Sequence, residues 1–135
     1  MSMIGTKGSF TRVIAATDTA AAVGSGTIDV CATPVIAAAM EAAAVAALAP
    51  HLNDDETTVG TRISLTHTAP SLVGMTLTAC AEITAHTGRQ YEFTVTVRDE
   101  IGVVAEGTHT RVLVNTSRFL ANADARTCLL YTSPS

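Results

Sequence analysis

Residues 33–50 read TPVIAAAMEAAAVAALAP. A hydroxyl residue followed by proline is typical of a helix start, with Thr33 as the N-cap and Pro34 in the first helical position. Alanine is the strongest helix former, and it fills most of the stretch that follows. Proline cannot continue a helix, so Pro50 should end it. The pattern therefore predicts one long helix over residues 35–49.

This helix would be apolar on almost every side, so it has no solvated face of its own and must be covered. A loop is expected around residues 24–26, and the segments that favour strands are residues 8–16, 57–67, 75–85, 89–98 and 103–115. The last four are rich in Thr, Val and Ile and are separated by short turns, which favours antiparallel hairpins. We predict an α+β fold in which a curved antiparallel sheet wraps around one small-residue helix, with a second subunit covering the remainder.

Composition bounds the possible partners. The 135 residues carry a net charge of −4, with 8 Lys and Arg against 12 Asp and Glu, and only 4% are aromatic. There is no basic stripe for nucleic acid or for a membrane surface. No apolar leader opens the chain, and the apolar run of residues 34–49 looks too short to span a bilayer. Three cysteines without a CxxC motif suggest reduced thiols in a cytoplasmic protein.

The last eight residues, CLLYTSPS at positions 128–135, look like the translation of a transposon-type sequencing adapter read in frame. A reading frame taken from metagenomic reads would end in this way. We therefore interpret residues 1–127 as a single domain and residues 128–135 as a tail outside the fold argument.

Two residues stand out as candidates for chemistry. Glu41 is the only charge within the helical stretch, and a buried carboxylate must either hold a partner or shift its pKa upward. His67 ends a predicted strand just before a turn, from where its ring could reach into a cleft and titrate near neutrality. His109 is a competing histidine on the last strand. The chain has no histidine or cysteine cluster with metal spacing, no Walker A loop and no GxSxG.

Several motifs in order along the chain resemble the fluoroacetyl-CoA thioesterase-like family of hot-dog proteins. The resemblance covers about residues 8–122 and is carried by Ala32-Thr33-Pro34, Met40-Glu41, Ala49-Pro50-His51-Leu52, Val59-Gly60-Thr61, Thr66-His67-Thr68-Ala69 and Gly107-Thr108-His109-Thr110-Arg111. It implies the hot-dog fold and hydrolysis of a small acyl-CoA to a free acid and CoA. It also implies a homodimer that needs no metal or cofactor beyond the coenzyme A of its substrate.

The resemblance also assigns roles to five positions. The family's catalytic threonine, glutamate and histidine fall on Thr33, Glu41 and His67. A glycine whose amide faces the thioester carbonyl falls on Gly60, and an arginine near the active-site water falls on Arg111. These residue types suit the reaction, which needs a nucleophile or activated water, a base and an oxyanion donor. Covalent attack by Glu41 and attack by water both remain open.

One departure concerns specificity. The family member selective for fluoroacetyl-CoA has a phenylalanine-bearing lid just before the catalytic threonine, whereas Gly24 and Thr27 stand at the corresponding positions here. We therefore expect that selectivity for fluoroacetyl-CoA is not retained.

A second point concerns geometry, because Thr33 and Glu41 are eight residues apart, or about 12 Å along one continuous helix. Either the Thr33 segment folds back, or a partner subunit supplies one of the two, or substrate bridges them. The alternative role for Thr33 is that of the helix cap alone. A hot-dog enoyl-CoA hydratase is disfavoured, since no histidine follows Asp29. The alternative from another class is a non-catalytic dimeric module that binds acyl-CoA or another hydrophobic ligand.

Overall fold

The structure is a computed structural model that describes residues 2–132. Its elements in chain order are β1 (Lys7–Val13), η1 (Ala16–Asp18), α1 (Ala20–Val23), α2 (Thr33–Leu48), η2 (Ala49–His51), β2 (Glu56–His67), β3 (Thr76–Thr87), β4 (Gln90–Arg98), β5 (Val103–Asn115) and α3 (Thr116–Thr132). The long helix and all five strands appear where the sequence pattern predicts them, to within a few residues. The short helices η1 and α1, the 3-10 turn η2 and the terminal helix α3 were not predicted.

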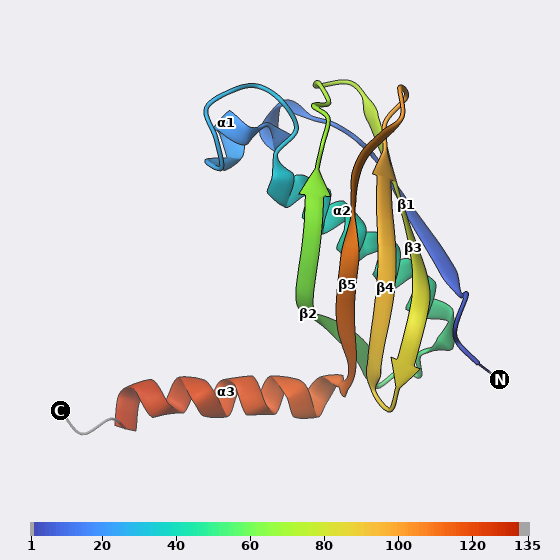
Figure 1. Cartoon of the computed structure of the whole chain (residues 1–135). Helices are drawn as coiled ribbons and strands as arrows, with labels where there is room; N and C mark the ends of the chain where they lie inside the picture. Colours follow the sequence, from blue (N-terminus) through green and yellow to red (C-terminus); the bar gives the residue numbers. More distant parts are fainter. Residues whose placement is uncertain (1, 133–135) are drawn as a thin grey trace.

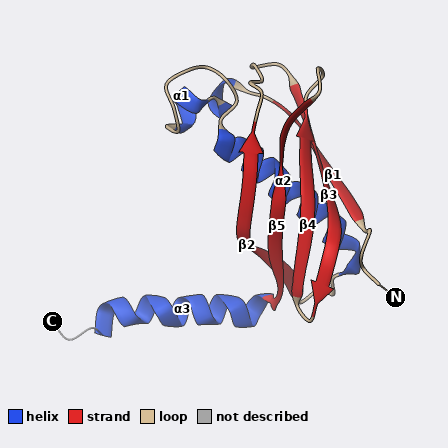
Figure 2. Ribbon diagram, in the orientation of Figure 1, coloured by secondary structure: helices blue, strands red, loops and turns tan. Residues whose placement is uncertain are grey.

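The five strands form one antiparallel sheet in the order β1-β3-β4-β5-β2. The sheet curves around α2, which lies across its inner face (Figures 1 and 2). The predicted arrangement of a curled sheet around one long helix is therefore confirmed. β1 and β2 are the two edges, and β2 pairs only with β5 among the residues described here.

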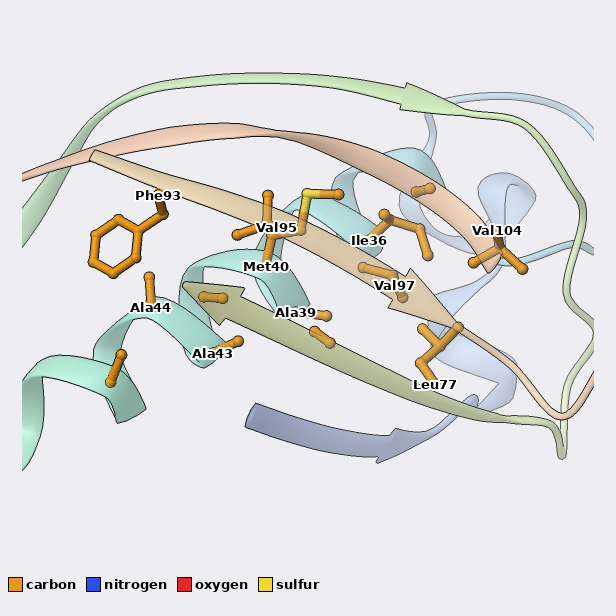
Figure 3. Close-up of a cluster of buried hydrophobic side chains, with 14 of the residues drawn as sticks. Ile36, Ala39, Met40, Ala43, Ala44, Leu77, Phe93, Val95, Val97 and Val104 are labelled. Carbon is orange, nitrogen blue, oxygen red and sulfur yellow. The ribbon is translucent and has the colours of Figure 1, made fainter. Parts of the chain in front are cut away.

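The core lies between α2 and the inner face of the sheet. Alternate residues along β4, including Phe93, Val95 and Val97, point inward and pack against the buried side of the helix (Figure 3). Small helix residues let the sheet come close. A Cβ at Gly8 of β1 would collide with the backbone of Ala43 and Ala47, so this strand lies directly on the helix backbone.

The two ends of α2 differ from the expectation. The N-cap is Ala32, and Thr33 is the first helical residue, with a side chain that caps nothing. The interpretation of Thr33 as the N-cap is therefore wrong, and its hydroxyl is available for other contacts. At the other end α2 stops at Leu48, one residue before the predicted end, and Pro50 lies inside the 3-10 turn that follows.

The sheet covers only one side of α2. Buried residues such as Ile36 and Met40 face the sheet, whereas Pro34, Ala38 and Val45 on the opposite side are exposed in the single chain. By length and composition alone, Thr33–His51 is apolar enough to cross a membrane, contrary to our expectation. A core helix passes the same test, and the contacts of α2 with every strand of the sheet explain its apolar composition.

The terminal helix α3 extends away from the sheet at the end of β5 (Figure 1). Its residues 117–130 are all exposed, so the body of the domain does not pack around it. Residues 128–132 of the suspected adapter tail continue this helix, and residues 133–135 lie outside the described residues. The interpretation of the tail as an artefact stays a prediction.

Candidate active site

Two predicted site residues meet where α2 begins and β2 ends. The Thr33 hydroxyl lies 2.9 Å from Nδ1 of His67, which is hydrogen-bonding distance. Because the Thr33 hydroxyl does not cap the helix, it is available for this contact with His67. The other ring nitrogen, Nε2 of His67, is buried and has no hydrogen-bond partner among residues 2–132. A buried ring nitrogen without a partner is the kind of group that a substrate can satisfy.

A cavity of about 270 Å³ opens beside this pair. Its walls come from the segment before α2 and from the turn after β2, and they include Ala20, Ser25, Val30, Cys31, Thr68, Ala69 and Pro70. Among the described residues, no Phe, Tyr or Trp side chain lines it. The position is suited to an acyl group because it is next to the only hydroxyl–imidazole pair in the described part of the chain.

Backbone hydrogen bonds hold the segment before Thr33 at the point where it joins α2. Ala32 N–H donates to the carbonyl of Asp18 (2.9 Å), and Cys31 N–H donates to the carbonyl of Ser71 (2.8 Å). Earlier in this segment α1 ends at Gly24, which adopts the left-handed conformation (φ 86°) that glycine favours. Burial raises the pKa of the Cys31 thiol, so this cavity residue stays protonated and is a poor nucleophile.

A second polar cluster lies two turns further along α2. Oε2 of Glu41 accepts a hydrogen bond from Nη1 of Arg111 on β5 at 3.2 Å, and Nε2 of His109 lies 4.0 Å from the same oxygen. The partner that the sequence predicted for Glu41 is thus Arg111. The Arg111 side chain is buried, whereas that of Glu41 is 45% exposed in the single chain. The carboxylate therefore stands at the boundary between the core and solvent.

Gly60 of β2 provides the surface on which Glu41 rests. Gly60 pairs with Arg111 in the sheet, and the ladder shifts register just after it, between Gly60 and Arg62. A Cβ at position 60 would lie 2.5 Å from Oε2 of Glu41, closer than real contacts allow. The absence of a side chain at this position is what lets the carboxylate approach the strand. The predicted role of the Gly60 amide toward a thioester carbonyl stays a prediction.

The structure thus groups the five predicted residues into two sets. Thr33 and His67 form one, and Glu41, Gly60 and Arg111 form the other. Since α2 is continuous from Thr33 to Leu48, the Thr33 segment does not fold back onto Glu41. Eight residues of helix separate the two by about 12 Å, so no direct hydrogen bond joins them within one chain.

Two partners of Arg111 give a weak signal or none in the sequence. Thr58 binds Arg111 through both its hydroxyl and its carbonyl, and no sequence pattern points to it. His109 was named only as a competitor of His67. A signal was present: His109 and Arg111 occupy alternate inward positions on β5, where apolar residues are the rule. Among residues 2–132 no three His, Cys, Asp or Glu side chains gather in a way that could hold a metal ion.

A curled antiparallel sheet around one helix, with a hydroxyl–imidazole pair at the helix start and a carboxylate on the same helix, defines a hot-dog thioester hydrolase. The comparisons with known proteins agree with this class. Residues 14–117 match the family described as fluoroacetyl-CoA-specific thioesterase, and the chain belongs to that family.

The relatives and solved structures support the family assignment. The fluoroacetyl-CoA thioesterase of Streptantibioticus cattleyicolor is 35% identical over 99 residues, which cover 73% of this chain and 71% of the relative. A crystal structure of the fluoroacetyl-CoA thioesterase FlK is 28% identical, covers 99% of both chains and superposes with a TM-score of 0.85. A hot-dog-like protein from Thermanaerovibrio acidaminovorans, 23% identical with 91% of both chains covered, shares the fold with a TM-score of 0.82. The protein is therefore a thioester hydrolase that acts on acyl-CoA.

Proposed function

We propose that this enzyme hydrolyses short acyl-CoA thioesters without selectivity for the fluoroacetyl group. The observation that carries this proposal is the Thr33–His67 pair beside a cavity that no described Phe, Tyr or Trp lines. Fluoroacetate and acetate differ by one small substituent, and a pocket distinguishes such groups by close apolar contact that excludes water. Gly24 and Thr27 stand where aromatic side chains would make that contact. The proposed substrate class is a short acyl chain that fits about 270 Å³.

The Thr33 hydroxyl donates to Nδ1 of His67 in the proposed resting state. In that tautomer Nε2 carries the hydrogen and points it at no described acceptor, so it is available to the substrate. Attack on the thioester carbonyl breaks the carbon–sulfur bond. His67 passes its Nε2 proton to the leaving thiolate of CoA while Nδ1 takes the proton of the Thr33 hydroxyl, and the proton released by the attacking water is returned to Thr33. Glu41 either takes the proton from the attacking water or attacks first and is released by water. Both routes give the free acid and CoA. Gly60 supplies an amide for the developing oxyanion, and Arg111 holds Glu41.

Homodimer formation is proposed because one chain leaves its catalytic groups apart and its helix half covered. The exposed side of α2 includes Val45, 45% exposed, and β2 is a 12-residue edge strand with no partner on its outer side among the described residues. A twofold interface is isologous, so one contact would cover both surfaces. In the dimer we propose that Glu41 of one subunit serves the Thr33–His67 pair of the other.

Mixing two inactive variants tests this arrangement. Thr33→Val and Glu41→Gln are each expected to abolish turnover as homodimers. If the site spans two subunits, each mixed dimer has one intact site, so an equal mixture that has exchanged subunits recovers about a quarter of wild-type activity. Subunit exchange is verified with differently tagged chains. A mixture that exchanges subunits but stays inactive would place both groups in one subunit, with substrate bridging them.

Release of CoA thiol from a panel of short acyl-CoAs, fluoroacetyl-CoA included, tests the substrate proposal. An enzyme-only blank corrects for the protein's own cysteines, of which Cys80 is exposed. We expect kcat/KM for acetyl-, propionyl- and fluoroacetyl-CoA to agree within about tenfold, because one small substituent contributes little discrimination in an apolar pocket. A preference of a thousandfold or more for fluoroacetyl-CoA would overturn the proposal. Loss of turnover in Glu41→Gln distinguishes catalysis by the enzyme from contamination.

We further propose that the enzyme works in the cytoplasm and needs neither a metal nor a cofactor other than the CoA of its substrate. Cys31 and Cys80 are free thiols, as expected in a reducing compartment, and the proposed roles are all filled by side chains and one backbone amide. The absence of a basic stripe from the sequence favours a small-molecule substrate over binding to nucleic acid or to a membrane surface.

A further inference from the structure

His109 is a buried, inward-facing histidine on β5 that none of the proposed catalytic steps uses. It is 2% exposed, and both of its ring nitrogens are engaged. Nδ1 lies 2.7 Å from the carbonyl oxygen of Arg62, across the β2–β5 ladder at the register shift. Nε2 lies 3.1 Å from Nη1 of Arg111. Each contact is short enough to be a hydrogen bond.

The partners of His109 fix its protonation state. A carbonyl oxygen only accepts, so Nδ1 must carry a hydrogen and donate it to Arg62. A guanidinium nitrogen only donates, so Nε2 must hold its lone pair and accept from Nη1 of Arg111. The ring is therefore neutral and in its Nδ1–H tautomer. A doubly protonated ring would point an N–H at a cation and lose the second contact.

Hydrogen bonds also hold the Arg111 side chain in one position. Its Nε donates to the Thr58 hydroxyl and its Nη2 to the Thr58 carbonyl, each at 2.9 Å. Its remaining nitrogen, Nη1, is shared between His109 and Glu41. Two strands thus hold every nitrogen of the guanidinium. The direction in which Nη1 meets the carboxylate is set by His109, because Thr58 holds the opposite edge.

One oxygen of Glu41 is committed by this arrangement and the other is not. Oε2 accepts from Arg111 and lies over Gly60, while Oε1 has no hydrogen-bond partner among the described residues. The side chain is nearly half exposed, so Oε1 is reachable from outside the core. A carboxylate held by one oxygen with the other left open suits a base or nucleophile that must face a reacting atom.

We propose that His109 is a positioning residue for thioester hydrolysis: its neutral ring, anchored on the Arg62 carbonyl, orients Arg111 so that Glu41 is held through Oε2 and presents Oε1. This rests on the proposed function of Glu41. The competing explanation is that His109 merely fills the core beside Phe93, whose ring lies 6.1 Å away.

Two substitutions test the contacts of the two ring nitrogens of His109 one at a time. An Asn amide reaches the place of Nδ1, so His109→Asn keeps the bond to the Arg62 carbonyl and loses the acceptor for Arg111. A Gln amide reaches the place of Nε2, so His109→Gln keeps that acceptor. We expect kcat to fall about 10- to 100-fold in His109→Asn, the effect of losing one hydrogen bond to a charged group, with KM within about twofold. His109→Gln should lose only a few-fold. His51→Gln, at an exposed histidine, is the matched control.

A second readout does not depend on turnover. Nitrogen-15 spectra of labelled imidazoles, assigned with His109→Gln, should show the Nδ1–H tautomer of a neutral ring at pH 7. A ring that is protonated or in the Nε2–H form would overturn the proposal. If His109→Asn fails to fold, Thr58→Val removes another acceptor of the Arg111 guanidinium and should lower kcat. Thr58→Ser keeps the hydroxyl and should therefore retain most of the wild-type kcat.

The outcomes distinguish this inference from the function on which it rests. Full activity in Glu41→Gln would refute the role of Glu41 and leave His109 without a target. An inactive Glu41→Gln together with equal kcat in His109→Asn and His109→Gln would refute the positioning role alone. Equal losses of kcat and thermal stability in both variants would assign His109 to the core.

Discussion

Gly60→Ala isolates the approach of Glu41 to the sheet. Gly60 does not adopt a positive φ, so alanine fits its backbone conformation without strain. The added methyl carbon would stand 2.5 Å from Oε2 of Glu41, 3.1 Å from Cε1 of His109 and 3.2 Å from Nη1 of Arg111. The last two distances are tight and the first is impossible. The substitution therefore displaces the carboxylate most, while His109 and Arg111 need to shift by only a few tenths of an ångström.

The size of the displacement follows from these distances. An ordinary carbon–oxygen contact needs about 3.4 Å or more, so Oε2 must retreat by about 1 Å. That movement breaks its 3.2 Å bond to Arg111. A misplacement of about 1 Å in a catalytic group can reduce the rate about 100-fold, and we expect that loss in kcat.

Stability should respond much less than activity. Glu41 is 45% exposed on its side chain, so the displaced carboxylate turns toward water instead of being buried without a partner. Arg111 is buried but keeps its hydrogen bonds to Thr58 and His109, so loss of this half-exposed pair should cost about 1 kcal/mol. Replacing glycine by alanine at a permitted conformation returns about 0.4–1 kcal/mol through the unfolded chain. We therefore expect the free energy of unfolding to change by less than about 1 kcal/mol.

The assay measures kcat and KM for a short acyl-CoA together with urea unfolding of the same preparations. Gly102→Ala is the matched control, because nothing lies within 4 Å of its Cβ position and its φ is not positive. Wild-type kcat in Gly60→Ala would refute the placement of Glu41 over Gly60. A loss of activity accompanied by more than about 3 kcal/mol of stability would show that the methyl group disturbs the sheet instead.

Three further predictions concern other parts of the site. Thr33→Ser keeps the hydroxyl that contacts His67 and should retain turnover within about tenfold, whereas Thr33→Val removes the hydroxyl and should lose about 100-fold or more; equal kcat values would dismiss the hydroxyl. Burial lowers the pKa of His109 from its ordinary 6.5, and the charge of Arg111 adds to this effect. The hydrogen bond to the Arg62 carbonyl and the charge of Glu41 oppose it. The charged residues Arg62 and Glu92 line a pocket together with His109. The unfolded chain therefore binds the proton more tightly, so stability should fall as the pH drops below about 6.5, and this part of the fall should be missing in His109→Gln; identical profiles would contradict it. Treatment with EDTA followed by gel filtration should leave kcat unchanged, and a loss that zinc or magnesium restores would overturn the metal-free proposal.

The fold could be predicted because its strongest signal is local. An alanine-rich stretch between two prolines forms a helix in almost any context, and alternating strands with short turns pair with their neighbours. The boundaries were harder. The Thr33-Pro34 pair suggested a cap at Thr33, yet Ala32 is the N-cap and the helix begins with Thr33 itself. The Thr33 hydroxyl contacts His67, 34 positions away in sequence, and a local pattern does not reveal such a contact.

The site could be predicted only in part for a similar reason. Glu41 stood out because a single charge in an apolar helix needs an explanation, and Arg111 was available from the family resemblance. Thr58 gave no signal, because threonine is common in strands and its two bonds to Arg111 depend on the register between β2 and β5. No turn joins β2 to β5, and their register shifts after Gly60, so a sequence pattern does not reveal which residues face each other.

The continuity of α2 constrains how the two polar sets work together. A straight helix fixes the separation of Thr33 and Glu41 at about 12 Å whatever the side chains do. Side-chain movement cannot close that gap while Glu41 stays bonded to Arg111, and releasing that bond would discard the arrangement that Thr58 and His109 maintain. The remaining possibilities are that a second subunit or a bound substrate connects the two polar sets. An apolar helix with one side uncovered, next to an unpaired edge strand, favours a second subunit over a bridging substrate, because the same contact then covers the helix and completes both sites.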